Sequence, residues 1–243
     1  MVLTGHFSDR AILWDTQMGT PIRSFRHRPH SGPVFTVEFH PQGDQILTGG
    51  ADSYARLWNC QTGEELTAFR HDTACSGTFD PSGGRILTVG SDHYARQWNA
   101  NTHQPIGPPL RHRGCLTGGA FSQDGRTLLT CSIDGTARLW DVATCKQLGP
   151  SFQHSERVLG AAFWPDDQTI VTETGKADHI NSPIGEAKYW RIPQSVSGTD
   201  TELTRWAEVI TGSELKPHGG VSVLKPDEWA KRSSQLPSQV QRD

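Results

Sequence analysis

Short runs of apolar and β-prone residues recur along the chain as far as Trp190, and each run is bounded by Gly, Pro, Asp or Asn. The clearest set is VFTVEF at 34–39, QILTGG at 45–50 and YARLWN at 54–59. Runs of about five or six such residues between turn-forming residues are typical of antiparallel sheets built from hairpins. The pattern therefore predicts an all-β fold.

The same order of runs and turns repeats along the chain, and a tryptophan closes each copy. Self-similarity at about 40 to 50 residues is typical of propeller blades of four strands each. Residues 2–14 match residues 46–58, so the first copy lacks its leading strand. We therefore expect a β-propeller of about five blades, incomplete or open. The closing tryptophans are Trp14, Trp58, Trp98, Trp140 and Trp190.

The repeat pattern stops after Trp190. We expect the propeller blades to occupy residues 1–193 and a small tail to occupy residues 194–243. The fifth copy also carries an insertion, KADHINSPI at 176–184, where the other copies need only a few residues. Because binding often resides in loops on a rigid scaffold, we interpret this insertion as a projecting loop.

The tail predicts a helix, a hairpin and a second helix. Thr199 and Glu202 have the spacing of a capping box at the start of a helix. The segment 213–224 contains a Pro-His-Gly-Gly turn between two β-prone stretches, and Pro226 opens a second short helix. We therefore expect a small C-terminal helix and hairpin unit.

Three full copies carry the same residues in register, namely a histidine, then VxxVxF, xPxG, LxTG, an aspartate and RxW followed by Asp or Asn. This pattern resembles WD-repeat β-propeller proteins over about 190 residues. The resemblance implies that a loop histidine, a Ser or Thr, a turn aspartate and a tryptophan form a buried hydrogen-bonded chain in each blade. A buried indole N–H needs an acceptor and a buried carboxylate needs donors, so this chain would hold the blade in one arrangement.

By this resemblance the fourth copy has all four members of the chain, and the others have fewer. Gly50 and Gly90 stand where the fourth copy has the hydroxyl of Ser132, so we expect the second and third blades to be weaker. In the fifth copy the aspartate position falls in the insertion, where Asp178 is a substitute. The network residues are His112, Ser132, Asp134 and Trp140 in the fourth copy, His71, Asp92 and Trp98 in the third, His27 or His30 with Asp52 and Trp58 in the second, and His154, Thr174 and Trp190 in the fifth.

The tail has a resemblance of its own. LTRWAEVITGSEL, GGVSVL and DEW resemble the C-terminal end of large bacterial proteins in which a serine/threonine kinase domain precedes WD repeats. The kinase landmarks themselves, which are the HRD loop, the DFG motif and the glycine-rich phosphate loop, do not occur in this sequence. The resemblance implies a regulatory or docking part of such a kinase.

Charge and composition narrow the classes of partner. The formal net charge is −3, so we expect no general affinity for nucleic acid or anionic membranes. No apolar run reaches the length of a membrane span and no leader peptide is evident, which predicts a cytoplasmic protein. The five cysteines form no CxxC pair, so we interpret them as reduced core residues. We expect neither a metal site nor a cofactor.

Two sets of residues are compatible with a catalytic or metal site as well as with a structural role. Ser132, His112 and Asp134 are the residue types of a hydrolase triad, but they recur as a repeat element and lack a GxSxG turn. In the insertion, Asp178 and His179 are possible metal ligands, together with Asn181, without any ligand-spacing pattern behind them. The structural network and a solvated loop are the favoured interpretations.

Arginines precede the first strand of several copies at equivalent positions. A propeller brings such positions to one face, where grouped arginines can hold carboxylates or phosphates, although solvated strand ends are the simpler interpretation. We expect a noncatalytic scaffold that binds a protein or peptide, with self-association through open propeller edges. The alternatives are a docking part of a bacterial kinase and a hydrolase. The arginines are Arg26, Arg28, Arg70, Arg111 and Arg113.

Overall fold

The structure, a computed structural model, describes residues 1–29, 32–175, 185–192, 213–215 and 221–223. All regular elements in these ranges are β-strands, which confirms the all-β fold. The chain divides into two units, Met1–Ile192 and Pro193–Asp243.

Three sheets in the first unit have four antiparallel strands each, in the order of the chain. The first strand of each sheet is the inner strand and the fourth is the outer strand. The strands are β4 (Val34–Phe39), β5 (Gln45–Gly50), β6 (Tyr54–Asn59) and β7 (Glu65–Arg70), then β8 (Cys75–Phe79), β9 (Arg85–Gly90), β10 (Tyr94–Asn99) and β11 (Pro105–Arg111), and then β12 (Leu116–Phe121), β13 (Thr127–Ser132), β14 (Thr136–Asp141) and β15 (Gln147–Gln153).

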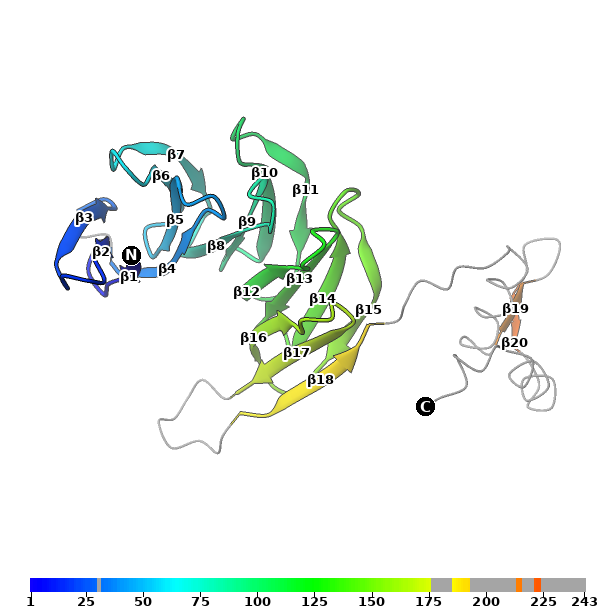
Figure 1. Ribbon diagram of the computed structural model, residues 1–243. Helices are drawn as coiled ribbons and strands as arrows, with labels where there is room; N and C mark the ends of the chain where they lie inside the picture. Colours follow the sequence, from blue (N-terminus) through cyan, green and yellow to red (C-terminus); the bar gives the residue numbers. More distant parts are fainter. Residues whose placement is uncertain (30–31, 176–184, 193–212, 216–220, 224–243) are drawn as a thin grey trace. The chain divides into compact units, whose positions relative to one another are not determined.

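A three-stranded sheet stands at each end of this series. The first sheet corresponds to the second, third and fourth strands of a blade, and the last to the first, second and third. The five sheets follow one another along an arc, and the first does not meet the last (Figure 1). These findings confirm about five blades with incomplete ends. The end strands are β1 (Val2–Gly5), β2 (Arg10–Trp14) and β3 (Pro21–Arg26), and β16 (Val158–Phe163), β17 (Thr169–Thr174) and β18 (Ala187–Arg191).

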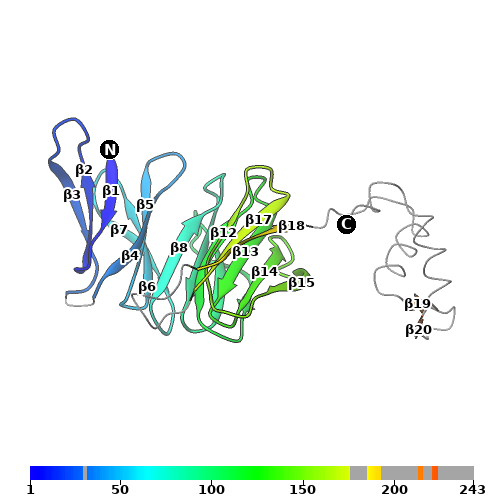
Figure 2. The ribbon, with the colours of Figure 1, turned by 90° about the horizontal axis from the view of Figure 1, so that it is seen from below.

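The core lies between the sheets, which stand side by side in chain order (Figure 2). We call the side of a sheet that is turned toward the next sheet along the chain its forward face, and the opposite side its backward face. Leu47, Leu57 and Phe69 on one forward face pack against Phe79 and Ile86 on the next backward face. Four such clusters hold the five sheets together, since each removes apolar surface from water.

The outer strands β7, β11 and β15 are largely exposed on their outer side. Pro105 begins β11, where a missing N–H costs little because the strand lies at a sheet edge. These outer strands hold the apolar residues Phe69 and Leu110 against the core.

In the second unit, β19 (Ser213–Leu215) pairs antiparallel with β20 (Val221–Val223), which fits the predicted hairpin. The two predicted tail helices and the insertion at 176–184 lie outside the described residues. Within the described ranges, no helix is long and apolar enough to cross a membrane.

Candidate functional site

A chain of polar side chains runs through the sheet β4–β7. The indole Nε1 of Trp58 donates to the hydroxyl of Thr48 at 2.8 Å, and this hydroxyl lies 2.7 Å from Nε2 of His27. The other ring nitrogen of His27 lies 3.2 Å from a carboxylate oxygen of Asp52. The hydroxyl therefore accepts from the indole and contacts the imidazole, whose Nδ1 lies near both Asp52 and Arg56.

The same contacts recur in the next three sheets. In each, a threonine of the second strand accepts the indole N–H of the closing tryptophan at 2.8 Å. The hydroxyl of that threonine also lies 2.7 to 3.0 Å from Nε2 of the loop histidine. The sets are His71, Thr88 and Trp98, then His112, Thr130 and Trp140, and then His154, Thr172 and Trp190.

The hydroxyl assignments to Ser132 and Thr174 are therefore wrong. Residues two apart share one face of a strand, and the tryptophan reaches the hydroxyl that lies nearer to it. The Ser132 hydroxyl accepts from the backbone N–H of Asp134 at 3.1 Å, and Thr174 donates to the carbonyl of Glu186 at 3.1 Å. The expected weakness of the second and third blades loses its basis, because Thr48 and Thr88 supply their hydroxyls.

Gly50 and Gly90 have a different role, which is to leave room for the histidine ring. A Cβ at Gly50 would lie 2.9 Å from Nδ1 of His27, and a Cβ at Gly90 would clash with the ring of His71. The fourth blade has Ser132 at this position.

The ring and the aspartate of that fourth blade are further apart. His112 Nδ1 lies 3.4 Å from Asp134, and the hydroxyl of Thr136 bridges the two groups. It donates to an oxygen of Asp134 at 2.6 Å and lies 3.2 Å from the ring nitrogen.

Arginines complete the network from the third strand. Arg56 lies 2.6 Å from Asp52 and Arg96 lies 2.7 Å from Asp92, whereas Arg138 is 3.8 Å from Asp134. The side chain of Arg56 is only 4% exposed. Its guanidinium is buried against the carboxylate that it neutralises.

These contacts set the charges of the network. Burial on its own raises the pKa of Asp52, but hydrogen bonds and charge from His27 and Arg56 together hold this pKa below its ordinary value. Burial lowers the pKa of His71 and of His154, and it lowers the pKa of His112 to about 4. These three histidines are therefore neutral at neutral pH, and the aspartates are ionised.

The two end blades depart from this scheme. In the first, Trp14 donates to Thr4 at 2.8 Å, and Nε2 of His6 lies 3.1 Å from the same hydroxyl. His6 stands at the position of Gly50, so its ring replaces the loop histidine of the inner blades. In the last blade, Nδ1 of His154 has no hydrogen-bond partner among the described residues, and Asp178 lies outside them.

The geometry does not assemble a hydrolase triad. His112 directs Nε2 to Thr130 and not to Ser132, whose hydroxyl accepts from the backbone N–H of Asp134. A serine nucleophile needs a general base within hydrogen-bond reach, and Ser132 has none there. Among the described residues no group of His, Cys, Asp or Glu side chains is arranged to hold a metal ion. The proposed loop ligands at 178–181 lie outside those residues, as does His30.

The five arginines lie at the last residue of an outer strand or two residues after it. Arg26, Arg70 and Arg111 are the last residues of β3, β7 and β11, and each pairs with the first residue of the adjacent third strand. Arg26 forms an ion pair with Asp9 at 3.0 Å, and Arg28 stacks over the ring of Tyr54. Arg70, Arg111 and Arg113 are exposed, and none of their side chains forms an ion pair with a described residue.

A groove of about 530 Å³ follows the inner strands β4, β8 and β12. Phe35 is 56% exposed in it, and polar atoms come from Thr36, Ser76 and Thr117. Glu38 is the one charged residue that lines it. Burial raises the pKa of Glu38, although hydrogen bonds from Thr78 and the Phe79 backbone oppose this effect. The groove was not predictable from the repeat pattern, because it forms only where three inner strands are brought together by the stacking of their sheets.

Comparison with known proteins gives one family. Residues 19–59 and 109–141 match the WD domain, G-beta repeat family. No curated protein matches the chain. The two matched segments cover parts of four sheets, mainly β4–β6 and β12–β14. The sheets β8–β11 and β16–β18 repeat their strand order and their Trp–Thr–His contacts. The matched repeats, the strand order and the recurring contacts together fit a WD-repeat β-propeller.

Proposed function

We propose that this chain is a noncatalytic interaction scaffold that binds an extended segment of a partner protein in the groove along β4, β8 and β12. WD repeats are typical of protein-interaction scaffolds. The observation that carries the proposal is the groove itself, which combines an exposed aromatic ring, Phe35, with hydroxyl groups and one carboxylate. We expect the networks described above to hold each blade in one arrangement, and a preformed groove lowers the entropic cost of binding.

Glu38 indicates the chemistry of the partner. An anionic side chain in a partly dehydrated groove attracts a cation more strongly than a fully solvated one does. The backbone N–H of Phe79 donates to one oxygen of Glu38 at 3.3 Å and fixes the carboxylate in place. We therefore expect the bound segment to present a Lys or Arg side chain to Glu38 and an apolar side chain to Phe35.

A selection from a displayed library of unstructured peptides tests this function. Selected peptides should be enriched in Lys or Arg, and their binding, measured by fluorescence anisotropy, should weaken about tenfold or more in Glu38→Gln. Glu64→Gln is the matched control, since Glu64 is exposed in a turn away from the groove. Peptides that bind both variants as tightly as the wild type contradict the proposal.

The alternative role, a regulatory or docking part of a bacterial serine/threonine kinase, rests on the tail resemblance alone. Only β19 and β20 of that tail are described. A kinase reading frame next to the coding sequence supports this alternative, and its absence removes it. The cytoplasmic location likewise stays a prediction.

A further inference from the structure

The sheet at each end of the series has one face that does not pack against another described sheet. Every inner contact joins a forward face to a backward face. The forward face of the sheet β16–β18 and the backward face of the sheet β1–β3 have no such counterpart among the described strands. This inference concerns these two faces and is independent of the groove.

The forward face of β16–β18 carries two exposed aromatic side chains. Tyr189 is 66% exposed, although the equivalent residues Leu57 and Leu139 are buried at inner interfaces. Trp164 is 48% exposed and contacts Tyr189 edge to face, with ring centroids 5.8 Å apart. Val171 on β17 lies beside them at the position of the buried Leu47.

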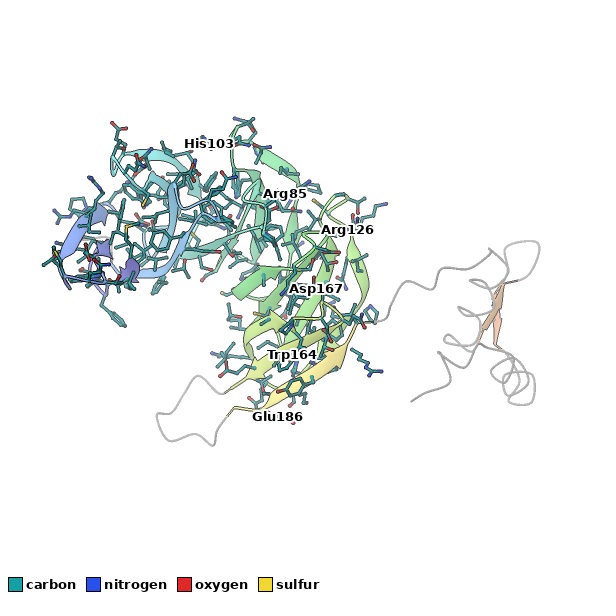
Figure 3. The ribbon with its side chains drawn as sticks, viewed as in Figure 1. Arg85, His103, Arg126, Trp164, Asp167 and Glu186 are labelled. Carbon is teal, nitrogen blue, oxygen red and sulfur yellow. The ribbon has the colours of Figure 1, made fainter. Side chains whose placement is uncertain are left out.

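Trp164 occupies the position that His40 has in the sheet β4–β7, and His40 contacts the next sheet. The ring of His40 lies edge to face against Phe79, and its Nε2 lies 3.1 Å from the carbonyl oxygen of Gly83. Figure 3 places Trp164 on the last sheet of the series. Aromatic residues in such positions are typical of the energetic centre of an interface.

The backward face of β1–β3 supplies the opposite half. Val2 is 48% exposed, whereas the equivalent residues Ile46, Ile86 and Ile170 are fully buried against a preceding forward face. Trp14 is only partly buried and stands at the position of Trp58, which is buried in the same kind of contact.

Glu173 lies on the forward face of β16–β18 and is exposed. The equivalent residues Val89 and Cys131 are buried against the next sheet, whose inner strand covers them. Covering a carboxylate in this way without a partner is costly. Among the described strands none pairs with the inner side of β1, so the sheet β1–β3 leaves this position uncovered.

We propose that the forward face of β16–β18 binds the backward face of β1–β3 of a second copy of this chain. The contact is head to tail, so each copy uses a different face and chains of copies form unless the rotation closes a ring. Tyr189, Trp164 and Val171 of one copy cover Val2 and Trp14 of the next.

Sedimentation velocity of the full chain over a concentration series up to about 100 μM tests the proposal. The wild type should form dimers and longer oligomers as the concentration rises. Tyr189→Asp and Val2→Asp should each weaken association about tenfold or more, because either charge is buried in the contact. Both residues are exposed in the single chain, so circular dichroism and thermal unfolding should show unchanged folding; Tyr189→Lys is a second variant of the same face.

An equimolar mixture of the two variants distinguishes a head-to-tail contact from a symmetric one. Tyr189→Asp keeps the face of β1–β3, and Val2→Asp keeps the face of β16–β18, so the mixture should form a dimer of one copy of each that grows no further. Leu66→Asp on the outer strand β7, where Leu66 is 39% exposed, should associate like the wild type. A monomeric wild type, a self-associating single variant or a mixture without the dimer overturns the proposal.

Discussion

The hydroxyl of Thr130 is the centre of the fourth blade, because it accepts the indole N–H of Trp140 and contacts His112 at once. A side chain without a hydroxyl would leave the buried indole and imidazole nitrogens unpaired. The cost of such unpaired groups is about 1 to 3 kcal/mol.

Thr130→Val should therefore lower the free energy of unfolding by about 2 kcal/mol, since valine keeps the shape and removes the hydroxyl. Ser132→Ala should lower it by less than about 1 kcal/mol, because only one hydrogen bond from the Asp134 backbone is lost. Urea unfolding followed by tryptophan fluorescence measures both values. Equal losses in the two variants would count against the assignment of Thr130.

The sequence pattern placed the tryptophans of all five blades and the histidines and turn aspartates of the third and fourth. It left His27 and His30 as alternatives in the second blade and did not predict the role of His6 in the first. It missed the hydroxyl for a physical reason. Thr130 and Ser132 lie two residues apart and share a strand face, so alternation alone does not separate them. The cross-strand register determines which hydroxyl the indole contacts. Trp140 pairs with Leu128, and its indole extends to Thr130, two residues further along the same face.

Acid should destabilise the protein in two steps. The folded-state pKa values of His71, His112 and His154 are lowered by burial, so unfolded chains bind more protons than folded ones below about pH 6.5. Stability is full above this pH and falls as the pH decreases toward the folded-state value of His112, about 4. The lowered pKa values of Asp52, Asp92 and Asp134 add a second loss below their ordinary value of 3.8.

The expected loss from His112 alone is up to roughly 3 kcal/mol between pH 7 and pH 4. Urea midpoints measured across this range check it, and His112→Gln should flatten the slope because glutamine does not titrate. A midpoint that stays constant or rises on acidification would refute the account of buried neutral histidines.

At the level of elements, the first three strands of each blade were predicted closely, whereas the fourth strands were not marked. The outer strands carry prolines and exposed polar residues, as PIGPPLR at β11 illustrates. Their strand geometry comes from pairing with the third strand, which the sequence of the outer strand alone does not show.

Gly90 is the last residue of strand β9, and the ring of His71 occupies the space that a Cβ at this position would need. Gly90→Ala should destabilise the protein by about 1 to 3 kcal/mol, since the new methyl group meets the ring and lies 2.7 Å from a carboxylate oxygen of Asp92. Gly118→Ala on β12 is the control, because its nearest neighbour would be Cys131 at 3.4 Å. Thermal unfolding compares the two, and equal stability of both variants would contradict the steric role of Gly90.

At the level of the whole molecule, the repeat period predicted about five blades and their incomplete ends. The groove and the two end faces were beyond that prediction, because they depend on which strands of different repeats meet. The arginines at the ends of β3, β7 and β11 were predicted to share a face, and they occupy equivalent positions in successive blades.

If these arginines bind anionic partners, the triple variant Arg26→Glu, Arg70→Glu and Arg111→Glu should lose proteins that the wild-type chain captures in a pull-down analysed by mass spectrometry. Arg126→Glu with Lys146→Glu changes charge at the opposite ends of the strands and should leave the captured set unchanged. An identical set from the triple variant would exclude this face as a binding surface.

His6 gives the first sheet a property that the others lack. The ring that elsewhere arrives from a preceding loop is here encoded within residues 2–14, next to the indole that depends on it. The first hairpin is therefore self-sufficient in this respect, because His6, Thr4 and Trp14 all lie within residues 2–14. An inner hairpin without its preceding loop would lack the imidazole.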